Sequence, residues 1–544
     1  MKNTHIKLLP LSVLTLAFFT ANAATAQDAP LGAGQVLQQN QAKEIAPKKS
    51  EINLQLPGDT GQAVQPGGKT VELITVAFSG NTVFTDEVLL AELGEALQQP
   101  QDLAGLRNMT EQITNFYRAS GYPFARALLP AQTLTQGKLQ IQIVEGKFGE
   151  VEATSNTAAL AAKAQSFLTP LKTGEVIASK PLERSLLLIT DLPGVQATPI
   201  IRPSDTQGAG DLEVKVTPEK RVSGEVSLDN HGSRFSGAYR ASGVIKANRL
   251  LTVGDQLSFS WLYSSEETWL GGLQYSLPVG SSGLTANVGY AHTDYTLGKG
   301  FEGYEGTAAV SSAGLSYPVI RSQQANVSVQ MTYQYKDLDD KGLSGFKKAT
   351  ASHSLPLQIS FDKRDAFAGG GITYGQFIVT PGQLDIEQFG AAAKDQSFTK
   401  LNLQVVRLQS LAERLTLVTK LDTQWTDKKD LDGSESFSLG GPQAVRAYPV
   451  SEGSDSRGLV VQMEVRYATA YGLTPYTFVD AGQTARGDVD GSKRRISGAG
   501  LGSSYAWKTL QLDANLAWAL SGGDSQADTK GNDPRFWLSA KYSF

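Results

Sequence analysis

The last nine residues of the chain alternate between apolar and polar side chains: Phe536-Trp-Leu-Ser-Ala-Lys-Tyr-Ser-Phe544. Successive side chains of a β-strand point to opposite faces. Every second residue from Phe536 to Phe544 is apolar, so these side chains would share one face of a strand. Residues 283–292 and 415–425 alternate in the same way. This period predicts β-strands with two unlike faces. A soluble β-sandwich and a β-barrel both remain possible at this point.

The pattern continues through the whole segment from residue 222, with breaks at Gly, Asp, Ser or Pro. Sixteen candidate strands begin near residues 222, 238, 255, 268, 283, 305, 325, 352, 372, 396, 413, 458, 474, 495, 508 and 534. An aromatic residue that ends an alternating terminal strand is typical of outer-membrane barrels, and we take Tyr542 and Phe544 as a C-terminal assembly signal. A sheet in lipid must close, because an open edge leaves backbone groups unpaired. We therefore predict a β-barrel membrane protein, with a 16-stranded transmembrane antiparallel barrel over 221–544.

Composition excludes several classes of function. Lys and Arg number 49 against 53 Asp and Glu, so a net charge of −4 disfavours a general nucleic-acid binder. The chain has no cysteine, which removes thiol catalysis, disulfides and zinc ribbons. Its four histidines, at positions 5, 231, 292 and 353, are scattered. We therefore expect no metal site, no cofactor and no enzymatic activity.

The first 26 residues have the pattern of a secretory signal peptide. Lys2 and Lys7 precede an apolar stretch over 8–19, and Ala24-Thr25-Ala26 supplies a small-residue cleavage site. The apolar stretch is too short to cross a bilayer as a helix. An N-terminal anchor helix is the alternative. With a signal peptide, the mature protein leaves the cytoplasm.

Residues 27–69 are rich in Gln, Gly, Pro and Lys. A short polar helix is possible over 31–43, and Pro57-Gly58 and Pro66-Gly67-Gly68 break any regular structure after it. Without further information, a disordered linker explains this composition equally well.

Two small α+β units follow, over 70–146 and 147–220. In the first, Leu106, Met109, Ile113 and Phe116 form one apolar helix stripe, and strand patterns lie on both sides of it. The order of elements recurs in the second unit. Neither unit contains a phosphate loop or a nucleophile with a nearby base. We expect them to bind extended peptide along an exposed strand edge, with a plain spacer as the alternative.

Several short motifs stand in a fixed order along the chain. They are Gln35-Val36-Leu37-Gln38 in the polar helix, Gly80-Asn81 and Gly121-Tyr122 in the first unit, Leu228-Asp229-Asn230-His231-Gly232-Ser233 at the start of the barrel, Leu439-Gly440-Gly441-Pro442-Gln443-Ala444-Val445-Arg446-Ala447-Tyr448-Pro449 in the longest inter-strand stretch, and Phe478-Val479-Asp480-Ala481-Gly482. Together they resemble the outer-membrane transporters of two-partner secretion, the haemolysin secretion/activation family.

The resemblance assigns a role to each motif. Residues 31–43 would be the family's plug helix, and the two α+β units its POTRA domains. Val445, Arg446, Ala447 and Tyr448 would form the tip of the sixth extracellular loop. An Arg inside a barrel needs an acidic partner, and the resemblance implies Asp480, with Phe478 and Gly482 on the same strand face. The family often has Gly where this chain has Ala447.

The resemblance also implies a function. We expect a pore in the bacterial outer membrane whose POTRA domains, in the periplasm, capture an unfolded partner exoprotein that is then translocated to the cell surface. The expected partners are a large β-helical exoprotein with an N-terminal secretion domain, outer-membrane lipid and, during biogenesis, the barrel-assembly machinery, but no nucleic acid. A barrel-assembly factor is the alternative. A passive porin is disfavoured because porins lack a POTRA pair.

Overall fold

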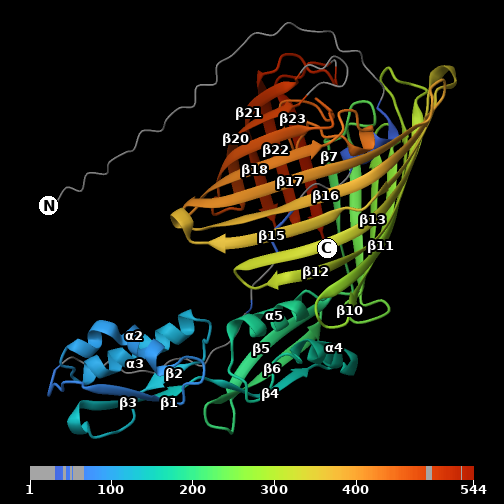
Figure 1. Ribbon diagram of the computed structural model, residues 1–544. Coiled ribbons are helices and arrows are strands. Elements are labelled where there is room, and N and C mark those ends of the chain that lie inside the picture. The colour runs from blue at the N-terminus through green and yellow to red at the C-terminus, as the bar shows by residue number, and fades with distance from the viewer. Residues whose placement is uncertain (1–30, 41–44, 49–51, 53–66, 486–492, 529) are drawn as a thin grey trace, which may run out of the picture.

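The computed structural model describes residues 31–40, 45–48, 52, 67–485, 493–528 and 530–544. The predicted signal peptide lies outside the described residues. Two small α+β domains sit at one end of a β-barrel, and the dark-blue N-terminal helix lies among the barrel strands near the opposite end (Figure 1). No helix in these ranges has both the length and the apolar character needed to cross a bilayer.

The first α+β domain packs helices on one face of a three-stranded sheet. Its elements are β1 (Thr75–Ser79), α2 (Asp86–Leu93), η1 (Gly94–Gln98), α3 (Leu103–Ala119), β2 (Arg126–Leu128), η2 (Thr135–Gly137) and β3 (Lys138–Val144), and the strand order is β1-β3-β2. Asp102 caps α3 by accepting a hydrogen bond from the Gly105 backbone N–H at 2.8 Å. The apolar stripe of α3 lies against the sheet, where buried Met109 and Ile113 share one apolar cluster with Leu139 and Ile141 of β3.

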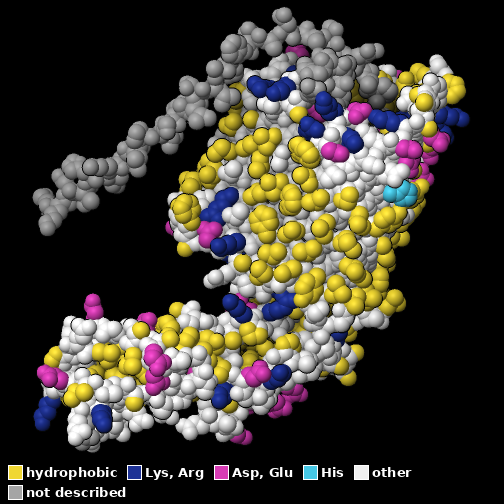
Figure 2. All heavy atoms as spheres, viewed as in Figure 1, with side chains coloured by type: hydrophobic (Ala, Val, Ile, Leu, Met, Phe, Trp, Pro, Cys, Tyr) yellow, Lys and Arg dark blue, Asp and Glu magenta, His cyan; other side chains and the backbone are white. Residues whose placement is uncertain are grey.

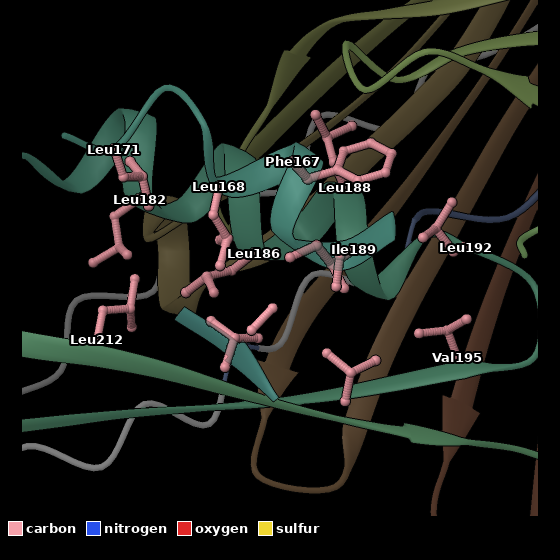
Figure 3. Close-up of a cluster of buried hydrophobic side chains, with 14 of the residues drawn as sticks. Phe167, Leu168, Leu171, Leu182, Leu186, Leu188, Ile189, Leu192, Val195 and Leu212 are labelled. Atoms are coloured by element: carbon pink, nitrogen blue, oxygen red, sulfur yellow. The ribbon is translucent and has the colours of Figure 1, made fainter. Parts of the chain in front are cut away.

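The second domain repeats this β-α-α-β-β order. Its elements are β4 (Lys147–Thr154), α4 (Ala158–Leu168), α5 (Ser179–Thr190), β5 (Val195–Pro203) and β6 (Ala209–Pro218), and the strand order is β4-β6-β5. Apolar side chains of α4 and α5, such as Phe167 and Leu186, meet Val195 and Leu212 from the strands (Figure 3). Burying apolar side chains in this way favours folding of the domain by about 1.5–3 kcal/mol for each large side chain.

The barrel is closed and antiparallel. Its strands are β7 (Val222–Asp229), β8 (Arg240–Asn248), β9 (Gln256–Ser264), β10 (Trp269–Val279), β11 (Leu284–Thr296), β12 (Glu305–Arg321), β13 (Ala325–Lys341), β14 (Lys347–Ser354), β15 (Leu357–Asp365), β16 (Gly371–Gln388), β17 (Lys394–Ala412), β18 (Leu415–Thr426), β19 (Gly458–Tyr467), β20 (Leu473–Thr484), β21 (Arg495–Trp507), β22 (Leu510–Ser521) and β23 (Arg535–Ser543). Three short 3-10 turns, η3 (Leu343–Gly345), η4 (Phe367–Gly369) and η5 (Gly433–Glu435), lie between strands.

Two of these seventeen strands share a single position in the barrel wall, so the barrel has sixteen strand positions. β14 and β15 are separated only by Leu355 and Pro356, and both pair with the same neighbours, β13 and β16. Proline has no N–H to give to the ladder, which explains the interruption. β23 pairs with β7 from Ser539↔Asp229 to Ser543↔Glu225 and closes the cylinder. The predicted fold class is confirmed.

The outer wall is apolar. Hydrophobic side chains cover the visible wall of the barrel, and Lys, Arg, Asp and Glu gather toward its ends (Figure 2). The exposed side chains include Tyr290, Tyr333 and Trp425. In lipid these are the favoured contacts, and the alternation seen in the sequence places the polar side chains in the lumen.

Candidate functional site

The loop between β18 and β19 folds back into the lumen instead of extending into solvent. Its two arms pair through backbone bonds between Phe437 and Asp455, at 2.6 and 2.9 Å. Leu439 and Val445 at its tip are fully buried and pack against wall residues such as Ile496. The tip therefore has an apolar seat on the inner wall, which positions the polar residues beside it.

Arg446 lies at the centre of this seat. Its guanidinium donates to both carboxylate oxygens of Asp480 at 2.8 Å, and its backbone N–H donates to the same carboxylate at 3.1 Å. Its third guanidinium nitrogen donates to Glu464 at 2.7 Å. The guanidinium carbon lies 3.4 Å from the centre of the Phe478 ring. All four side chains are buried, so the charges interact with little screening by water.

The structure thus brings together the residues that the resemblance paired, and it adds partners that sequence reasoning missed. Glu464 faces the lumen from β19 and also pairs with Arg466. The Trp537 indole donates to the Arg446 carbonyl oxygen at 2.7 Å, and Gln462 donates to the Ala444 carbonyl oxygen at 2.7 Å. Glu464 could have been found from the sequence, because the alternating polar residues Gln462, Glu464 and Arg466 predict one charged strand face toward the lumen.

Small residues on the wall make room for the loop. A Cβ at Gly482 would lie 3.2 Å from side-chain carbons of Leu439 and Val445, so little space remains there. Ala447 faces Gly498, where a Cβ would come within 2.5 Å of the alanine methyl. Ala447 keeps a negative φ, so this chain needs no glycine at that position. Tyr448 donates to the carbonyl oxygens of Ser521 and Gly523, both at 2.9 Å.

A second buried carboxylate holds the base of the loop. Glu452 is fully buried and accepts two hydrogen bonds from Arg494, at 2.9 and 2.5 Å. Its other oxygen accepts from the backbone N–H groups of Gln526 and Ala527, both at 2.9 Å. The loop between β22 and β23 is therefore fastened to the loop between β18 and β19.

Helix α1 (Ala33–Asn40) lies inside the barrel. Val36 and Leu37 are buried in a cluster that includes Tyr295 and Leu338 on the wall. At its N-terminus, the Ala33 N–H donates to Asp340 at 2.6 Å, where a carboxylate is favoured by the helix dipole. Gln35 accepts from the Gly32 N–H at 3.2 Å, and Gln38 donates to the Ser434 carbonyl oxygen at 3.0 Å.

The helix contacts the same loop that carries Arg446. Ser434 belongs to η5, whose Glu435 is buried between Lys336 at 2.5 Å and Lys400 at 2.6 Å. Asp432, one residue before η5, pairs with Lys348. Helix, loop and wall therefore form one connected assembly that occupies the lumen.

Lys48, which follows the helix in the sequence, is held at the opposite end of the barrel by a closed ring of polar contacts. The Lys48 N–H donates to Asp362 at 3.2 Å, Asn326 donates to Asp362 at 2.9 Å, and Arg321 donates to Asn326 at 2.8 Å. Arg321 also forms a two-pronged ion pair with Asp191 of the second α+β domain, at 2.7 and 2.8 Å. The Lys48 ammonium lies 3.7 Å from the same Asp191 carboxylate. We call this ring the linker clamp.

The predicted residues of the first domain have structural contacts. Gly80 has a φ of 83°, which favours glycine, and the Asn81 amide donates to the Phe84 carbonyl oxygen at 3.0 Å and to Asp86 at 2.8 Å. The Tyr122 ring packs edge-on against Phe84. The Gly121 carbonyl oxygen accepts from Ser179 of the second domain at 2.8 Å, which joins the two domains.

A buried carboxylate supports this region. Glu145 accepts from the backbone N–H groups of Thr82 and Val83, at 2.6 and 2.8 Å, and from the Tyr117 hydroxyl at 3.0 Å. Burial raises the pKa of Glu145, but these hydrogen bonds, together with the one from the Thr82 hydroxyl, outweigh it and hold the pKa below the usual carboxyl range.

The terminal aromatic residues lie at the seam where the barrel closes. Tyr542 pairs in register with Val226, and the backbone of Phe544 exchanges two hydrogen bonds with Gly224, at 2.9 and 3.2 Å. Both rings face outward and stack with centres 6.5 Å apart. Across the described ranges, His, Asp and Glu side chains form no group that could hold a metal ion.

These features define a class: a closed barrel with a helix and a folded-in loop in its lumen, preceded by two POTRA-like domains, is an outer-membrane transporter. The family model described as haemolysin secretion/activation protein ShlB/FhaC/HecB matches residues 208–505, and the ShlB-type POTRA domain model matches 71–146. The chain belongs to this family. It is a two-partner secretion transporter of the bacterial outer membrane, with its POTRA domains in the periplasm.

Individual relatives agree with this assignment. The heme/hemopexin transporter protein HuxB of Haemophilus influenzae is 26% identical over 564 residues, covering 98% of each chain. The outer membrane transporter CdiB of Escherichia coli is 24% identical over 458 residues, covering 80% of this chain and 75% of CdiB. The solved structure of CdiB from Escherichia coli matches the fold with a TM-score of 0.68 at 21% identity, covering 94% of this chain and 96% of that one.

Proposed function

We propose that the lumen described here is the closed state of a pore for an unfolded partner exoprotein, that α1 is its removable plug, and that the loop carrying Arg446 has to stay seated on the wall for transport. The observation that supports this proposal is that helix, loop and wall form one connected assembly in the lumen. An extended polypeptide needs the space that this assembly occupies, so transport requires at least the helix to leave.

The roles of the individual residues follow from this proposal. Val445, Arg446 and Tyr448 keep the loop tip on the wall, where Phe478, Asp480 and Gly482 form its seat. Val36 and Leu37 hold the plug helix, and the linker clamp keeps the segment behind it at the periplasmic mouth. Because Asp191 belongs to the second POTRA domain, movement of that domain would loosen the linker.

The proposed partners are those expected from the family resemblance. The exoprotein is a large β-helical chain whose N-terminal secretion domain is captured unfolded in the periplasm. Outer-membrane lipid contacts the apolar outer wall. The barrel-assembly machinery inserts the barrel and reads Tyr542 and Phe544. The folding of the exoprotein outside the cell supplies the driving force for its translocation, so a nucleotide-hydrolysis site in this chain is not required.

The test is a deletion of this gene in its host, followed by comparison of surface and culture-supernatant proteins by mass spectrometry. We expect one exoprotein to disappear from both fractions and to return on complementation. Complementation with Asp480→Ala should fail, whereas Lys172→Ala, which removes an ion pair with exposed Glu175, should restore release. Loss of many outer-membrane barrels instead of one exoprotein would indicate an assembly factor and would overturn the proposal.

A further inference from the structure

The two POTRA sheets have four edge strands, β1 and β2 in the first and β4 and β5 in the second. An extended polypeptide can add to a sheet only at an edge whose outward N–H and C=O groups are available. Capture of an unfolded exoprotein by strand addition, which rests on the proposed function and on the strand-edge binding expected for these units, therefore depends on which of the four edges is open.

The β5 edge lacks two of its outward donors. Ser204 donates to the Ala209 carbonyl oxygen at 3.1 Å, and Glu219 donates to the Gly194 carbonyl oxygen at 2.9 Å, so the even-numbered residues of β5 pair with β6. The odd-numbered residues face outward, and two of them are Pro199 and Pro203. Proline has no N–H, so this edge cannot form a continuous ladder with another strand.

The β4 edge is occupied by the domain itself. Phe148 exchanges backbone hydrogen bonds with Gly174 and Glu175, at 2.7 and 2.9 Å. Further along, the Gln165 side chain accepts from the Ala153 N–H at 2.7 Å and donates to the Val151 carbonyl oxygen at 3.1 Å. This side-chain amide makes the two hydrogen bonds that a neighbouring strand would otherwise make.

The β2 edge is closed in a similar way. The Ala127 N–H donates to the Thr114 hydroxyl at 2.9 Å, and the Ala125 N–H donates to the Tyr122 carbonyl oxygen at 3.1 Å. Beyond the end of this three-residue strand, the Gln132 side chain exchanges two hydrogen bonds with the backbone of Gln140 on β3, at 2.8 and 2.7 Å. The short edge strand and the segment after it therefore leave few groups for a partner.

The β1 edge differs from the other three. Because Gln140 turns its N–H and C=O toward Gln132, the alternation of β3 turns residues 139 and 141 toward β1, and Val76 and Phe78 then direct their backbone groups outward. Between described residues, no hydrogen bond reaches these outward groups. Ile74, just before the strand, is 78% exposed, and Ala77 is exposed as well.

We propose that β1 is the edge at which the exoprotein is captured, by pairing of an extended segment of the unfolded exoprotein with Val76 and Phe78. The partner is a polypeptide because the open groups are backbone donors and acceptors spaced along one strand. A five-residue strand pairs with any extended segment through its backbone, which suits an unfolded chain. An apolar side chain of the added segment would cover Ile74, which gives the pairing a preference for alternating apolar sequence.

The full-length chain lends itself to a direct test because it contains no cysteine. Single cysteines are introduced at one exposed position of each edge strand: Ala77→Cys in β1, Leu128→Cys in β2, Glu152→Cys in β4 and Thr198→Cys in β5. Each variant is labelled with a benzophenone maleimide in cells that secrete the exoprotein identified by the gene deletion. Cross-linked products are then detected with an antibody against that exoprotein.

We expect the Ala77→Cys variant to give at least tenfold more cross-linked exoprotein than the other three, and its labelling to reduce release. Equal or stronger cross-linking at Leu128→Cys, Glu152→Cys or Thr198→Cys would overturn the assignment to β1, as would release without any cross-link at Ala77→Cys. In these cases the exoprotein still depends on the gene, so the proposed function survives. If release does not depend on the gene at all, the proposed function itself has failed.

Discussion

The most informative perturbation is removal of Arg446 or of Asp480, because the two changes are not equivalent in this site. Arg446→Ala leaves Asp480 and Glu464 buried without the guanidinium that joins them. Breaking a buried ion pair in this way costs about 3–5 kcal/mol. Asp480→Ala leaves Arg446 with Glu464 as a partner, so the loss is the two charge-assisted hydrogen bonds of the guanidinium, about 3 kcal/mol, together with the weaker one from the Arg446 backbone N–H.

The double variant removes both members and leaves Glu464 paired with Arg466. Its effect should be little worse than that of either single change, which corresponds to a coupling of about 3 kcal/mol. Both single variants should release little exoprotein, while the barrel itself stays folded because its backbone ladders are unchanged. The charge-exchanged pair should recover only partly, since the planar fork of Arg depends on direction.

The assay measures how often the loop leaves its seat. Val445→Cys places a thiol at a fully buried position of the loop tip, in a chain without other cysteines. A loss of about 3 kcal/mol should speed maleimide labelling of this thiol about 100-fold. The barrel fold is checked by heat-modifiable migration on a gel. If the effects of the two single changes add in the double variant, or if either change alone leaves release and labelling unaltered, Arg446 and Asp480 do not act as one unit.

Four further outcomes are expected. Deletion of residues 27–50 should raise ion conductance in planar bilayers, because α1 would leave the lumen; unchanged conductance would mean that the segment is only a linker. Asp191→Asn should increase the frequency of channel opening without changing the open conductance, because it weakens the linker clamp but removes no atoms from the lumen. The control is Glu213→Gln, which affects a partly exposed ion pair with Arg202 and should leave channel opening unchanged. Deletion of residues 71–146 should abolish release and leave a folded barrel, and continued release would refute a capture role. Glu145→Gln should destabilise the first POTRA domain by about 1–3 kcal/mol at neutral pH, as measured by hydrogen exchange in the full-length protein. Because the folded-state pKa of Glu145 is lowered, this stabilisation is present above the usual carboxyl pKa and is lost as the pH falls through the folded-state value, so wild type and variant should converge in acid.

Local periodicity predicted the strands, and the aromatic residue at the end of the last strand then favoured a membrane barrel over a soluble sandwich. Alternation with period two, repeated from residue 222 to the end of the chain, is a property of each strand by itself, and closure follows from the absence of water in the bilayer core. The number of strand positions in the barrel followed from counting turns. Only the pairing of β14 and β15 with the same two neighbours showed that the interruption at Pro356 lies within one strand position.

Neither the partners of Arg446 nor the capture edge could be read from sequence alone. The family resemblance supplied Asp480, but Glu464 and Trp537 join the site from strands whose place around the cylinder depends on the register of every pair between them. The caps that close the β2 and β4 edges, made by Thr114 and Gln165, depend on how each helix lies over its sheet. A residue's own strand pattern determines which way its side chain points, whereas the group it meets there is decided by long-range packing.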